Sequence, residues 1–134
     1  MADDLQKLKQ AAINIERSIS IGAKPSVSNL EALLDIYNEL VEMGDAEAML
    51  SRPWARLRLI YAKMGTEKPN RAVVASLTGN AKVEIIIIAK MGATELDLWI
   101  GGMKRIAKSK EELEVLRKLV GYKKGFDEVL KMLD

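Results

Sequence analysis

The sequence predicts an all-α fold, a compact multi-helix bundle of about six or seven short helices. Apolar residues recur at alternating spacings of three and four along most of the chain, which indicates amphipathic helices. Glycines and Ser-x-x-Glu motifs mark ends and starts between these stretches. The hydrophobic set makes up 49% of the 134 residues and aromatics only 4%, so the core must be aliphatic, as is typical of packed helices. This length predicts a single helical domain over residues 1–134.

Three helices are predicted in the N-terminal part. Residues 3–21 carry one apolar stripe from Leu5 to Ile19. Ser28 and Glu31 have the spacing of a capping box, so a second helix is expected from Ser28 to the stop at Gly44. Residues 45–51 suggest a turn, and a third helix is expected from Pro53, a residue favoured in first turns, to Met64 and Gly65.

Residues 71–91 allow two interpretations. The segment from Ala81 to Met91 contains four consecutive isoleucines, and as a helix it is apolar nearly all round, which indicates burial. Alternatively, residues 72–77 and 82–88 pair as a small β-hairpin at 72–88 across Gly79 and Asn80. The helical pattern on both sides favours the helix, and the hairpin stays open.

The C-terminal part predicts helices at 94–107, 109–121 and 126–133, the second opened by a capping box at Ser109 and Glu112. Met-Gly pairs recur at 43–44, 64–65 and 91–92, and each is expected to end a helix. The centres of the apolar stripes are expected to be largely buried: Leu33, Tyr37, Leu57, Ile86, Trp99, Met103 and Leu116.

The absence of cysteine and histidine removes whole classes of chemistry. Disulfides, a cysteine nucleophile, Ser-His-Asp catalysis and most zinc sites are excluded. Neither phosphate-binding glycine motif occurs. We therefore predict a non-enzymatic protein without catalytic residues, metal or cofactor.

The start of the chain lacks the apolar stretch of a signal peptide, and the longest apolar run, at 85–89, is far too short to cross a bilayer. These features predict a soluble cytoplasmic protein with no membrane partner. Abundant Lys and Glu, without Cys or His, lean towards a thermostable protein, either from a thermophile or of designed origin.

Charge is unevenly distributed. Residues 25–51 hold six acids and no Lys or Arg, whereas residues 52–71 hold six bases and one acid. Such asymmetry can mark a nucleic-acid surface. It can equally belong to two helices of one hairpin that attract each other.

The basic segment resembles a helix-turn-helix over some 25 residues. Residues 57–64 would be the supporting helix, 65–68 the turn and 69–77 the recognition helix, although Tyr61 stands where a small residue is usual. A second basic face lies near Gly101. The residues expected to contact nucleic acid are Arg52, Arg56, Arg58, Lys63, Lys68, Asn70, Arg71, Lys104, Arg105 and Lys108.

Two function classes follow. In the first, a small helical protein associates with duplex DNA or RNA through these bases. In the alternative, it is a helical protein–protein interaction or structural module, bound to a protein partner or to itself as a homo-oligomer. The position of the bases discriminates between them: if the acidic face of the second helix lies against the bases from Arg52 to Lys63, the nucleic-acid interpretation weakens.

Overall fold

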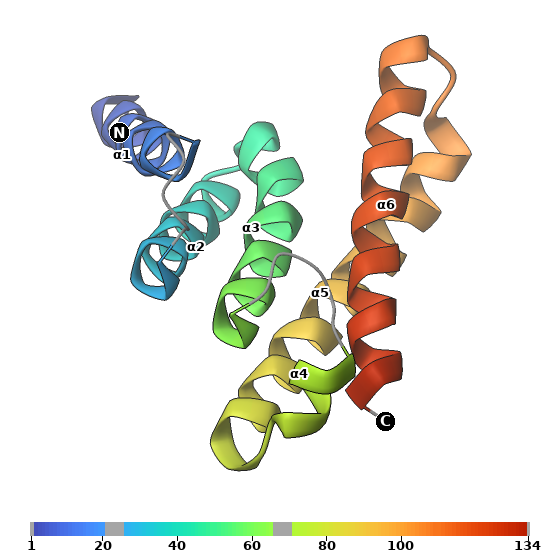
Figure 1. Ribbon diagram of the computed structural model, residues 1–134. Coiled ribbons are helices and arrows are strands. Elements are labelled where there is room, and N and C mark those ends of the chain that lie inside the picture. The colour runs from blue at the N-terminus through green and yellow to red at the C-terminus, as the bar shows by residue number, and fades with distance from the viewer. Residues whose placement is uncertain (1, 21–25, 66–70, 134) are drawn as a thin grey trace. The chain divides into compact units, whose positions relative to one another are not determined.

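The computed structural model describes residues 2–20, 26–65 and 71–133, which form six helices and no strand (Figure 1). The all-α prediction is confirmed, and the hairpin alternative at 72–88 is wrong, because residues 79–106 form one helix. The helices are α1 (Ala2–Ser20), α2 (Val27–Glu42), α3 (Ala46–Met64), α4 (Arg71–Ser76), α5 (Gly79–Ile106) and α6 (Lys110–Leu133).

The chain divides into two compact units, Met1–Ala55 and Arg56–Asp134, with the division inside α3; a single domain stays a prediction. In the first unit α1 packs on α2 (Figure 1), and four leucines of α2 are buried. The buried Tyr37 donates a hydrogen bond to Glu16 of α1, and burial, helped by Glu16, raises the pKa of this tyrosine. Lys9 of α1 forms an ion pair of 3.1 Å with Asp45.

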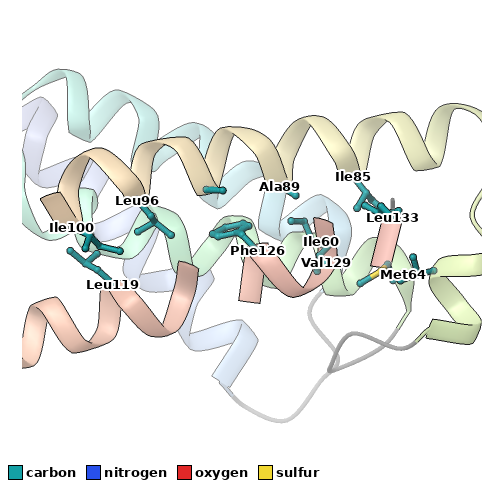
Figure 2. Close-up of a cluster of buried hydrophobic side chains, with 12 residues drawn as sticks. Ile60, Met64, Ile85, Ala89, Leu96, Ile100, Leu119, Phe126, Val129 and Leu133 are labelled. Atoms are coloured by element: carbon teal, nitrogen blue, oxygen red, sulfur yellow. The ribbon is translucent and has the colours of Figure 1, made fainter. Parts of the chain in front are cut away.

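The second unit is built on the long pair α5 and α6, with α4 packed on α6. Leu96 and Ile100 of α5 face Leu119 of α6, and Phe126 lies farther along the same seam (Figure 2). Phe126 is completely buried. The buried cluster comprises Ile60, Met64, Val74, Ile85, Ala89, Ala93, Leu96, Ile100, Leu119, Phe126, Val129 and Leu133.

Two predicted helix starts are wrong. The hydroxyl of Ser26, not of Ser28, caps α2 by accepting from the backbone N–H of Asn29 at 3.1 Å. The carboxylate of Asp45 accepts from the N–H of Ala48 at 3.1 Å, so α3 starts at Ala46 where a turn was predicted. Pro53 therefore lies buried inside α3, where it gives up one backbone hydrogen bond.

Helix ends at Gly44 and Gly65 are confirmed, since both adopt positive φ, +85° and +72°. The breaks predicted near Gly92 and Gly121 are wrong. Neither of these glycines has the positive φ that ends a helix, and α5 and α6 run through them. The helices α5 and α6 are consequently longer than predicted, while the six helices of the described residues agree with the predicted number of about six or seven. The capping box at the start of α6 is confirmed by two bonds between Ser109 and Glu112, of 3.1 and 3.2 Å.

The predicted core is partly confirmed. Leu33 and Tyr37 are buried. The other five predicted core residues are only partly buried at the edge of the second unit's cluster: Leu57, Ile86, Trp99, Met103 and Leu116. The interior face of α5 is centred instead on Ile85, Ala89 and Leu96. The predicted core residues of this helix lie at the border of that face.

Candidate interaction surfaces

The predicted basic surface begins with Arg52 on α3. This side chain is half-buried and donates a hydrogen bond of 3.2 Å to the side-chain oxygen of Asn38 on α2. The contact lies within the first unit. Arg52 thus reaches α2 through the side-chain amide of Asn38.

Two further bases of α3 pair with acids of α5. Arg56 is only 8% exposed and forms an ion pair with Glu95. Lys63 lies 3.1 Å from the carboxylate of Glu84. These pairs bind the C-terminal part of α3 to one flank of α5, so each of the two cations already has a carboxylate partner within the second unit.

Arg58 is half-buried beside Tyr61. Burial raises the pKa of Tyr61, the charge of Glu128 adds to the rise, and the charge of Arg58 opposes it. Arg58 therefore stands in a mixed-charge environment of its own unit. None of the four α3 bases predicted to bind nucleic acid is a simple solvated cation.

The predicted recognition helix is only partly described. Lys68 and Asn70 lie outside the described residues. Arg71 is exposed at the start of α4. With six residues, α4 makes less than two turns, and its buried residue Val74 joins the core of the second unit.

Lys104 and Arg105 are exposed in the last turn of α5, and Lys108 is exposed just beyond its end. No carboxylate of the described chain lies within ion-pair distance of these three. Gly101 and Gly102 precede them on the exposed surface, and an added Cβ at either glycine would meet nothing within 4 Å. This basic end is thus open to an anionic partner.

The most exposed apolar surface was missed by the sequence prediction. Val83, Ile87, Met91 and Leu98 of α5 are exposed by 54%, 52%, 54% and 73%. Their spacings of four, four and seven place them on one helix face, with the exposed Thr94 between the last two. We call Val83, Ile87, Met91, Thr94 and Leu98 the α5 stripe. Because residues 81–91 of α5 are apolar nearly all round, periodicity assigned this part of the helix to the core.

Charges border the α5 stripe on both sides. Glu84 and Glu95 lie on the flank that meets α3. Lys90 and Asp97 share the other flank. Asp97 forms an ion pair of 2.7 Å with Lys123 of α6, yet its side chain stays 61% exposed; this pair raises the pKa of Lys123. Asp97 can therefore meet a second cation.

Comparison with protein families, characterised proteins and solved structures finds no match to this chain. Among the described helices, none has an apolar stretch long enough to cross a membrane.

Proposed function

We propose that this chain is a helical protein–protein interaction module without catalytic activity. The α5 stripe carries the proposal. Four large apolar side chains, each more than half exposed, lie along one helix face. Soluble proteins rarely leave contiguous apolar surface in water unless it binds something. An exposed helix face of this kind suits docking against another helix or in a groove.

The charges support the same proposal. Arg56 and Lys63 are held by Glu95 and Glu84, and Arg52 by Asn38. Binding phosphates with these side chains would require breaking contacts inside the fold. A buried pair such as Arg56 with Glu95 is costly to break, because it leaves a charge without its partner in a poorly solvated place.

Association with duplex DNA or RNA is the second candidate, favoured by the exposed cluster Lys104, Arg105 and Lys108. The open surface at Gly101 and Gly102 would allow a phosphate backbone to approach closely. The helix-turn-helix at 57–77 stays a prediction within this candidate.

A photo-crosslinking experiment tests the interaction module. A benzophenone amino acid replaces Val83 or Leu98 in the full chain, which is expressed in the cells that naturally produce this protein. We expect both positions to give an adduct with the same protein, identified by mass spectrometry. The matched control is Lys118 on α6, which is also exposed and should give no such adduct. Equal labelling from all three positions would contradict the proposal.

An anisotropy titration separates the second candidate. Labelled duplex DNA and RNA are titrated with wild type and with Lys104→Ala/Arg105→Ala/Lys108→Ala at low and physiological salt. The interaction module predicts no salt-dependent binding at micromolar protein. Nucleic-acid binding through the cluster predicts that the triple variant lowers the salt slope by about three units, one per lost phosphate contact.

A further inference from the structure

Building on the proposed interaction function, we propose that the partner is a second copy of this chain. The two α5 helices pack antiparallel through the α5 stripe, with a two-fold axis passing between Met91 and Thr94. Such an interface is isologous, so each contact occurs twice.

The residue spacing fits a helix-to-helix seam. Ile87, Met91, Thr94, Leu98 and Gly101 follow spacings of four, three, four and three, the a/d pattern of a coiled-coil seam. In the antiparallel register, Met91 faces the partner's Thr94 and Ile87 faces the partner's Leu98. Large residues thus meet where Ile87 lies opposite the partner's Leu98, whereas a threonine lies opposite a methionine at the centre.

The same register explains Gly101 and Gly102. A glycine inside a helix costs about 1 kcal/mol relative to alanine, and within the chain nothing lies within 4 Å of a Cβ built at either position. Packing in the chain's own fold therefore gives no reason for them. In the antiparallel pair, the partner's Val83 lies against these glycines, and the missing side chains let the helices approach closely.

Charge selects the antiparallel orientation. Lys90 and Asp97 lie on the same flank of the stripe, and antiparallel packing places Lys90 beside the partner's Asp97 and the reverse. In a parallel pair, Lys90 would instead lie beside the partner's Glu95. That carboxylate is held by Arg56, with its side chain only 14% exposed, and is poorly placed to bind a second cation. Asp97 would lie beside the partner's Gly102 and gain no charge partner.

The stripe extends over about four helical turns, which gives an interface at the small end for specific complexes. Interfaces below about 1,200 Å² belong to weak or transient associations. We therefore expect a monomer–dimer equilibrium in the micromolar range rather than an obligate dimer.

Cysteine cross-linking tests the register, because the chain has no cysteine of its own. On mild oxidation, the full chain with Ile87→Cys/Leu98→Cys is expected to form a covalent dimer. Leu98→Cys alone is the matched control: in this register the two copies of that position are about 16 Å apart along the axis, well beyond the Cα separation of about 7 Å that a disulfide spans. Dimer from the single variant, or none from the double variant, would overturn the antiparallel register.

Sedimentation velocity at about 5 to 200 µM, the range suited to a weak interface, tests the association itself. Wild type should shift from monomer to dimer, and Leu98→Glu should abolish the shift. Lys90→Glu should weaken dimerisation about tenfold, since two ion pairs become two repulsions. Lys90→Glu/Asp97→Lys should restore it, while Lys118→Glu leaves it unchanged. Thermal melts confirm that each variant is folded.

A wild type that stays monomeric over this range would overturn the proposal of a second copy. If Val83 and Leu98 then still photo-crosslink to one different protein, the interaction function stands with another partner. If they give no protein adduct and the chain binds nucleic acid, the interaction function fails as well.

Discussion

The two long faces of α5 differ little in hydrophobicity and greatly in burial. One face carries Ile85, Ala89 and Leu96, all completely buried against the second unit. The other carries Ile87, Met91 and Leu98, each more than half exposed. Leu96 and Leu98 are identical side chains two residues apart on one helix, at 0% and 73% exposure.

Residue size separates the two faces better than polarity does. The buried face includes Gly92 and Ala93, small residues that let Phe126 of α6 come close to the helix axis. The exposed face lacks this adaptation around its centre and carries branched or long side chains instead. The buried face is thus shaped for α6, whereas the exposed face offers apolar area without a counterpart in the chain's own second unit.

Truncation of the two leucines should show the difference between the faces most strongly. Leu96→Ala should lower the free energy of unfolding by about 2–5 kcal/mol, because it removes buried methyl groups and leaves a cavity. Leu98→Ala should change it by no more than about 0.5 kcal/mol, as for other exposed positions. Urea unfolding at a concentration that keeps the chain monomeric measures both.

An equal loss for both variants would contradict the difference between the two faces, since it would mean that the stripe is buried inside the monomer. A loss at Leu98 that grows with protein concentration would show that this residue stabilises an associated state, because only association depends on concentration by mass action.

The flanks of α5 give a second, smaller contrast. Arg56→Ala should cost about 2–3 kcal/mol, because Glu95 would keep its charge in a poorly solvated place without this ion partner. Lys63→Ala should cost about 0.2–1 kcal/mol, since the side chain of Glu84 is 59% exposed. Thermal unfolding at low and high salt checks both values.

Salt provides the control. Screening acts on exposed pairs more than on buried ones, so the cost of Lys63→Ala should fall at high salt while that of Arg56→Ala persists. If Arg56→Ala and Lys63→Ala lowered the stability by similar amounts, and if high salt removed both losses, Arg56 would be no more buried than Lys63.

The helical class could be predicted from the sequence because spacing, capping and composition agree. The capping box at Ser109 was recognised because both its bonds are local. Ser26 and Asp45 also cap helices through local bonds, but Ser28 and Pro53 offered competing start signals at nearby positions. Local rules rank such starts poorly, since packing of the whole helix decides among them.

The burial pattern of α5 could not be predicted, for a physical reason. Its apolar residues surround the helix, so periodicity gives no preferred face. The destination of Arg56 was equally hidden, because its acid lies 39 positions away on another helix. Counting bases in a segment describes their density and not their neighbours, and the neighbours decide whether a cation can meet a phosphate.

The effects most specific to the two faces of α5 come from adding one methyl group to a glycine on each. At Gly92 the new Cβ would lie 2.5 Å from the Cζ atom of Phe126, whose ring is completely buried and has little room to move. Overpacking of this kind costs about 1–3 kcal/mol, of which the better helix propensity of alanine returns up to about 1 kcal/mol. Gly92→Ala should therefore destabilise the monomer.

At Gly101 the Cβ meets nothing within 4 Å, so Gly101→Ala should stabilise the dilute monomer by about 0.5–1 kcal/mol. Urea unfolding gives both values, and Phe126→Leu supplies the check, since a smaller side chain at that position should reduce the penalty of Gly92→Ala and leave the gain of Gly101→Ala unchanged. If Gly92→Ala and Gly101→Ala both stabilised the monomer, α6 would not pack closely against Gly92. The buried face of α5 would then not be fitted to α6 as the structure shows.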